Sequence, residues 1–218
     1  MERQTPKATA PQEIEVRSIV SDLAIRLKED GGASRTIAGY AAKFDSWSEP
    51  IWGWFRERID RSAFDKTDMQ DVIMCFNHDI SGVLARSTSG TLRLEVDDIG
   101  LRFEFEAPET SLGNDMLALV KRGDISKCSF KFTVDADEWR YADEDNGLEY
   151  DERTVKGISR LYDVSLVTYP AYKDTEASVR ERLEERKRKA LEKSAPAPAS
   201  VNTEGRNRLI QQLSLKNR

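Results

Sequence analysis

The sequence predicts a mainly β fold with a small number of α-helices. Apolar and polar residues alternate along most of the chain from residue 13 to residue 169, as they do in strands that bury one face. Glycine- and aspartate-rich turn signals separate these alternating runs. Helical spacing of apolar residues is confined to two segments, 112–122 and 174–193. Strands are therefore expected to outnumber helices.

The N-terminal region is expected to contain a short leader followed by a hairpin. Residues 1–12 have no usable periodicity and are interpreted as a flexible leader, so that folding begins near Glu13. A first strand is indicated by alternating apolar positions, Leu23, Ile25 and Leu27. The tetrapeptide EDGG at 29–32 supplies a turn before a second strand at 35–44.

The middle of the chain is expected to form a buried strand and then a hairpin. The stretch DVIMCFNHDI, residues 71–80, is an apolar strand that runs out into the only histidine of the chain, His78. Residues 92–96 and 101–105 alternate on either side of a turn at 97–100, which predicts a hairpin with one face in the core.

A helix over residues 112–122 is indicated by signals at both of its ends. Thr110 or Ser111 can cap its N-terminus, and Gly123 can stop it. The following strand, 126–139, is expected to turn one set of side chains to a common face: Cys128, Phe130, Phe132 and Val134. Ser129 therefore faces away from the aromatic side of its own strand.

Two strands are expected near the end of the folded region. Residues 148–155 and 158–169 follow a turn at 143–147, and Pro170 ends the second strand. Alternation along that strand places one set of side chains on a common face: Leu161, Asp163, Ser165 and Val167.

The character of the chain changes after Pro170. Residues 174–193 combine helix formers with i,i+4 pairs of opposite charge and have only a thin apolar stripe, which indicates a solvated helix. The spacer SAPAPAS and the basic tail RNRLIQQLSLKNR complete the chain. We expect a folded domain over residues 13–193 and a linker with a peptide tail over residues 194–218.

Composition limits the classes of partner and compartment. The net charge of −5, from 39 acidic and 34 basic residues, gives no excess of positive charge for a nucleic-acid partner. No run of about 18 apolar residues could span a membrane, and no secretory signal is visible, so an intracellular protein is expected. Cys75 and Cys128 are too few for a disulfide framework and are interpreted as small buried hydrophobes.

The residues alone allow several chemistries and select none of them. No phosphate-binding glycine loop is present. Zinc could draw on Cys75, His78 and Cys128, but structural zinc usually needs four ligands, and strand parity separates the first two. Neutral His78 could act as a general base, or simply cap a turn beside Asn77 and Asp79. The nucleophile could be one of many serines, with Cys128 as a rival.

Several motifs occur in a distinctive order along the chain. They are GYAAKFDSWSEP, an apolar strand ending in FNHD, a GTL…GL hairpin, a helix ending in RGDIS, and LYDVSLVTYPAY. Over about residues 36–180 these motifs resemble the prohead (capsid maturation) proteases of HK97-type phages, which are related to the herpesvirus assemblins. The resemblance implies an assemblin-like β-barrel surrounded by a few helices, and a serine nucleophile served by a histidine.

Carried over residue by residue, the resemblance places the catalytic histidine on His78 and the serine on Ser129. Because the chain has one histidine, the Ser-His-His triad of the assemblins is impossible here. The acidic residue of the family ahead of VSLVTYPAY falls on Asp163, a position that is often glutamate in relatives. Asp79, adjacent to the histidine, is the fallback for the acid that orients the imidazole.

Asp163 and the two lysines that flank the Ser129 region have competing interpretations. Asp163 could instead close an ion pair between strands with Arg160 or Arg153. Relatives often carry small residues beside the serine, where this chain has Lys127 and Lys131. These lysines could line the substrate cleft, stabilise an oxyanion, or simply be exposed.

The resemblance implies a serine endopeptidase that cleaves the internal scaffolding segment of the major capsid protein, and itself, inside the assembling procapsid in the host cytoplasm. It implies no metal or cofactor, no membrane and no specific nucleic acid, and the analogy with assemblins suggests a homodimer. The alternative is an inactive assembly or scaffolding protein with the same fold, which would not need an intact pair of His78 and Ser129. The tail at 194–218 is a targeting peptide, a self-cleaved extension or a segment without a role.

Overall fold

The computed structural model of the chain describes residues 13–21, 23–27, 33–143 and 147–169, together with Glu184, Glu185 and Arg188, which are helical. The chain divides into two compact units, residues 1–174 and 175–218. The expected leader, the linker with its tail, and all but these three residues of the expected helix at 174–193 lie outside the described residues. The expected domain limits therefore stay a prediction.

The first unit is built mainly from strands. Its elements in chain order are β1 (Ile14–Val20), β2 (Ala24–Leu27), β3 (Ala33–Lys43), β4 (Phe55–Ile59), β5 (Ile73–Phe76), β6 (Asp79–Arg86), β7 (Leu92–Val96), β8 (Gly100–Glu106), α1 (Ser111–Arg122), β9 (Lys127–Arg140) and β10 (Asp151–Val167). The predicted mainly β class with few helices is confirmed. In the part of the chain that the structure describes, no helix is long and apolar enough to cross a membrane.

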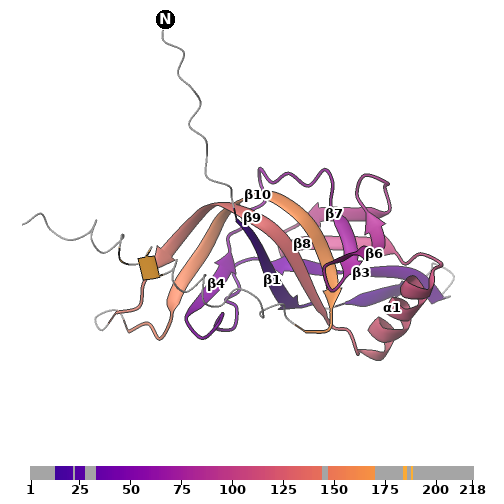
Figure 1. Cartoon of the computed structure of the whole chain (residues 1–218), viewed down its shortest axis with the longest axis horizontal. Helices are drawn as coiled ribbons and strands as arrows, with labels where there is room; N and C mark the ends of the chain where they lie inside the picture. Colours follow the sequence, from indigo (N-terminus) through magenta and orange to yellow (C-terminus); the bar gives the residue numbers. More distant parts are fainter. Residues whose placement is uncertain are drawn as a thin grey trace, which may run out of the picture. The chain divides into compact units, whose positions relative to one another are not determined.

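The strands form two sheets. The larger has the order β1-β9-β10-β5-β6, with β4 also paired to β10, and the smaller has the order β2-β3-β8-β7. Figure 1 shows β9 and β10 as a long, curved pair with β1 beside β9. The expected β-barrel is wrong, because within the described residues no pairing joins the edges of the two sheets and they stay open.

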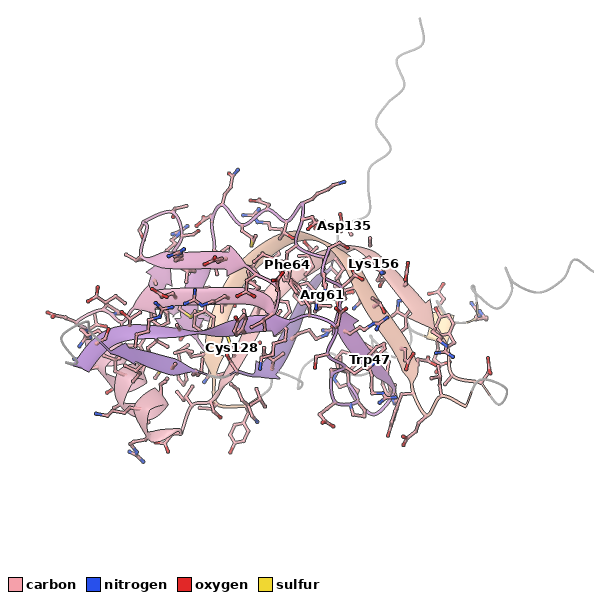
Figure 2. All side chains as sticks on the ribbon, turned by 180° about the vertical axis from the view of Figure 1, so that it is seen from behind. Trp47, Arg61, Phe64, Cys128, Asp135 and Lys156 are labelled. Carbon is pink, nitrogen blue, oxygen red and sulfur yellow. The ribbon has the colours of Figure 1, made fainter. Side chains whose placement is uncertain are left out.

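A single cluster of buried apolar side chains includes residues of both sheets. Phe130 and Phe132 of β9 are stacked, with ring centroids 4.6 Å apart, and they belong to the same core cluster as Phe103 and Phe105 of β8. Cys128, labelled in Figure 2, is fully buried in this cluster. The face of β9 that the sequence predicts to be apolar therefore faces the core. The opposite face of β9 carries polar side chains.

Three predictions that rest on local sequence patterns are confirmed. β7 and β8 pair as the predicted hairpin, with Leu94 opposite Phe103. In α1, the Thr110 side chain accepts a hydrogen bond from the Gly113 N–H, and Gly123 ends the helix in the left-handed conformation with φ 82°. β2 and β3 form the predicted opening hairpin, with Ile25 opposite Ile37.

β1 is not among the strands predicted individually from the sequence. It pairs antiparallel with β9 from Ile14 to Val20. A buried ion network anchors it: Arg17 binds Glu57 of β4 at 2.7 Å, while Arg153 of β10 binds Glu57 at 2.8 Å and Glu15 at 2.6 Å. Burial opposes ionisation of Glu15, but the two arginines lower its pKa to about 2. The network therefore links β1 to β4 and β10.

Candidate active site

His78 lies in the two-residue turn that joins β5 to β6. Phe76 and Asp79 are opposite each other at the end of the hairpin, and Asn77 and His78 between them have φ of 52° and 59°. Positive φ at both central residues is the condition for the type I′ turn that matches the twist of paired strands, and Asn and His tolerate it better than most residues. The Asn77 N–H donates to the Leu166 carbonyl at 2.9 Å, which fixes the turn against β10.

β10 brings the polar residues of three strands into register. It runs antiparallel to β9 and parallel to β5, so that Ser165 lies opposite Ser129 on one side and opposite Cys75 on the other. Asp163 lies opposite Lys131 of β9. Residues directly opposite each other on paired strands point to the same face, so Asp163, Ser165 and Ser129 share one face of the sheet.

A β-bulge sets the direction of Asp163. The pairing of β10 with β9 shifts register between Leu161, which is opposite Phe132, and Asp163, which is opposite Lys131. Phe132 and Lys131 are adjacent on β9 and point to opposite faces, so their partners do too. The prediction that Leu161 shares the face of Asp163 is therefore wrong. The bulge buries Leu161 in the core and puts Asp163 on the face of Ser129.

The structure brings His78, Ser129 and Asp163 into one hydrogen-bonded chain. His78 Nδ1 lies 2.6 Å from Asp163 Oδ1, and His78 Nε2 lies 2.7 Å from Ser129 Oγ. An imidazole with its proton on Nδ1 donates to the carboxylate and leaves Nε2 free to accept the hydroxyl proton. This is the arrangement of a hydroxyl nucleophile, a general base and an orienting acid.

Asp163 is buried and has charged and polar partners for both of its oxygens. Ser165 donates to Oδ1 at 3.1 Å, and Lys131 Nζ lies 3.3 Å from Oδ2. Burial opposes ionisation of Asp163, but the hydrogen bond and charge of His78, the charge of Lys131 and the Ser165 hydrogen bond lower its pKa below the ordinary value. The carboxylate is thus ionised at neutral pH. Lys131 forms an ion pair with it and does not face only solvent.

The two arginines considered as alternative partners of Asp163 form ion pairs with other residues. Arg160 pairs with Asp68 at 3.8 Å, and Arg153 belongs to the buried network with Glu57, so the expected alternative of an ion pair between Asp163 and either arginine is wrong. The exposed Asp79 carboxylate accepts hydrogen bonds from the backbone and side chain of Ser81. Asp163, and not Asp79, is the acid that contacts the imidazole.

The cysteines are placed for packing. Cys128 is fully buried on the core face of β9, away from Ser129, and burial raises the pKa of its thiol, which keeps it protonated. Burial also raises the pKa of Cys75 to about 11. Within the described ranges, no group of three or more His, Cys, Asp or Glu side chains could hold a metal ion.

Ser129 is enclosed in this state of the protein. Its exposed fraction is 0%, and its hydroxyl also lies 2.9 Å from the Arg17 carbonyl of β1, to which it can donate. The hydroxyl has one proton, so donation to Arg17 competes with donation to His78. While β1 lies against β9 at this point, a substrate carbonyl has no access to the Ser129 oxygen.

Two contacts of the site were missed by sequence reasoning. Alternation placed Ser165 on the face of Asp163, but nothing in the pattern showed that its hydroxyl would bind the carboxylate. The carbonyl of Arg17 gave no signal at all, because a backbone group carries no residue preference and its approach to Ser129 depends on pairing across 112 residues.

Comparison with known proteins gives one match. A family model described as Caudovirus prohead serine protease matches residues 21–189, which is most of the chain and includes His78, Ser129 and Asp163. β1 precedes the matched residues. Neither the curated proteins nor the solved structures contain a match to this chain.

Proposed function

Because the chain belongs to the prohead serine protease family of caudoviruses, we propose that it is an active serine endopeptidase with Ser129, His78 and Asp163 as its triad. The observation that carries the proposal is the unbroken hydrogen-bonded chain from Asp163 through His78 to Ser129. An inactive assembly protein of this fold would have no use for that chain, and its presence favours the enzyme.

The proposed chemistry is acyl transfer in two halves. Ser129 Oγ attacks the scissile carbonyl carbon as its proton passes to His78 Nε2, and the imidazolium then gives this proton to the leaving amine. Water, deprotonated by the same nitrogen, attacks the acyl-enzyme and releases Ser129. Asp163 keeps the proton of His78 on Nδ1 and stabilises the imidazolium that forms after each proton transfer.

The proposed substrate is the internal scaffolding segment of the major capsid protein, together with the protease itself. The support is the capsid maturation role of the family, which acts within the procapsid. Location in the host cytoplasm follows from that role, and a homodimer follows only from the analogy with assemblins.

Access to Ser129 is a separate requirement of this proposal. The reacting atoms must approach to about 3–3.5 Å, whereas Ser129 is enclosed with its hydroxyl bound by Arg17. His78 and Asp163 of β10 are members of the proposed triad, whereas β1 contributes only the Arg17 carbonyl that binds Ser129, so the proposal requires this part of β1 to move. Substrate therefore enters when the end of β1 separates from β9.

A reversible crosslink between β1 and β9 is expected to stop turnover. Val20, which is exposed, lies opposite Lys127. Opposite residues in antiparallel strands have Cα atoms about 4.5–5.5 Å apart, within the range of a disulfide. The double variant Val20→Cys, Lys127→Cys should hydrolyse substrate like wild type when reduced and fall to background when oxidised. Turnover is measured in both redox states of the same preparation, and equal rates would contradict a moving β1.

The function itself is tested by mixing the purified chain with the major capsid protein of the same phage. We expect intact mass spectrometry to show loss of a discrete segment from the capsid protein. A His78→Gln copy keeps a polar side chain of similar size but has no base, and it should leave the substrate whole. If wild type also leaves it whole in assembled proheads, the inactive assembly protein is the correct interpretation.

A further inference from the structure

Ser165 lies at the centre of the catalytic face but is not a member of the triad. It follows Asp163 by two residues on β10, with Ser129 opposite on β9 and Cys75 opposite on β5. Its exposed fraction is 0%. A hydroxyl at this depth has to satisfy its hydrogen-bonding capacity within the protein, so its partners identify what it holds.

Three of the four partner atoms of the Ser165 hydroxyl belong to two members of the triad, His78 and Asp163. Its Oγ lies 3.1 Å from Asp163 Oδ1, 3.2 Å from the backbone N–H of His78, 3.2 Å from His78 Nδ1 and 3.0 Å from Cys75 Sγ. Asp163 can only accept, so the hydroxyl proton goes to its carboxylate. The two lone pairs of the oxygen then accept from the His78 N–H and from the protonated thiol of Cys75.

This geometry constrains both the acid and the base. Asp163 Oδ1 receives Ser165 and His78 Nδ1 together, which fixes the plane of the carboxylate relative to the imidazole. The backbone of His78 has a positive φ, which non-glycine residues disfavour, and Ser165 holds that backbone through its N–H. One hydroxyl thus links the strained turn to the carboxylate that the ring must face.

We propose that Ser165 is a positioning residue of the hydrolytic site, which holds His78 in the tautomer with its proton on Nδ1 and its ring directed at Ser129. The proposal rests on the proposed function of the triad. Ser165 contacts neither substrate nor the reacting atoms, and it acts through Asp163 and His78.

The Ser165→Ala variant tests the proposal. Loss of the hydroxyl leaves the His78 N–H unpaired and removes one donor from Asp163, so kcat should fall on the order of 10- to 100-fold, with little change in KM, because a small misplacement of the base slows chemistry more than binding. The matched control is Ser18→Ala. Ser18 lies opposite Ser129 on β1, and its buried hydroxyl has no hydrogen-bond partner among the residues that the structure describes, so this variant should keep the wild-type kcat.

A spectroscopic measurement separates positioning from a general effect on packing. The chain has one histidine, so ¹⁵N-labelled histidine reports on His78 alone. We expect one tautomer, protonated at Nδ1, in wild type and in Ser18→Ala, and a mixture of tautomers in Ser165→Ala at the same pH. If the alanine variant does not fold, Ser165→Cys replaces it with the same expected loss, since a thiol is a weak donor and acceptor.

The outcomes separate this proposal from the proposed function. If Ser165→Ala matches Ser18→Ala in both kcat and histidine spectrum, Ser165 has no positioning role even though the enzyme is active. If wild type hydrolyses nothing, the function is wrong, while the histidine spectrum still decides whether Ser165 controls the tautomer.

Discussion

Replacing Ser129 with alanine is expected to leave the co-expressed capsid protein at its full mass, while the wild-type chain trims it. Removal of the nucleophile of a serine protease lowers kcat on the order of 10⁶-fold. The loss follows from the geometry, since no other hydroxyl lies within hydrogen-bonding distance of His78 Nε2 among the contacts of the described residues. Intact mass spectrometry of the capsid protein and of the protease measures both substrate and self cleavage.

The fold of the Ser129→Ala variant should survive the change. The substitution removes the hydroxyl contacts to His78 and to the Arg17 carbonyl, and leaving such buried groups unpaired costs about 1–3 kcal/mol. Ser18→Ala, on the paired strand β1, removes a hydroxyl that has no partner in the described part of the chain, and this variant should trim like wild type. Trimming by Ser129→Ala at the wild-type rate would show that another residue is the nucleophile.

Replacing Asp163 with asparagine is expected to lower kcat on the order of 10⁴-fold through the wrong tautomer of the histidine. When its amide nitrogen faces Nδ1, asparagine donates a hydrogen bond, and the imidazole proton moves to Nε2. That nitrogen then cannot accept the proton of Ser129, which lies 2.7 Å away. The loss of negative charge also removes the partner of the imidazolium and of Lys131. Initial rates on the capsid protein or a peptide from its cleaved segment measure the effect.

Asp79→Asn is the matched control for this prediction. Asp79 is adjacent to His78 in sequence, but it is exposed and its carboxylate binds Ser81. The control should therefore keep the wild-type kcat and the wild-type histidine tautomer. A larger loss in Asp79→Asn than in Asp163→Asn would reverse the assignment of the acid.

The elements that could be predicted from the sequence are those held by local interactions. α1 begins after its N-cap Thr110 and ends before its C-cap Gly123, because both signals act within one turn of the helix. The hairpin of β7 and β8 is set by its own alternation and by the short turn between its strands. In each case the residues that determine the structure are separated by only a few positions in the chain.

The features that could not be predicted depend on pairing between distant strands. The pairing of β1 with β9 places Ser18 opposite Ser129, and the parallel pairing of β5 with β10 places Cys75 opposite Ser165. A strand pattern shows which face is apolar but not which strand lies beside it. The wrong prediction of a barrel has the same origin. Whether a sheet closes depends on which strands pair at its edges, and no single strand pattern shows this.

The candidate site was predicted only in part. The single histidine narrowed the choice of base, and the family motifs supplied Ser129 and Asp163, but strict alternation gave the wrong surroundings for Asp163. The register shift between Leu161 and Asp163 puts these two side chains on opposite faces of the sheet, and no glycine or proline in the sequence marks it. A bulge of this kind is stabilised by the burial of Leu161 and by two partners of Asp163 that are distant in sequence, His78 from the turn between β5 and β6 and Lys131 from β9.

β10 is the last strand of the larger sheet to be synthesised, yet it lies in the middle of that sheet, between β9 and β5. A nascent chain that has emerged only as far as β9 contains the serine and the histidine but has neither the carboxylate nor the strand that aligns them. Domains fold as units once their sequence is complete, so a ribosome-bound or truncated chain would hold no peptidase activity. The order of the strands therefore means that the proposed triad can assemble only after the whole domain has been translated.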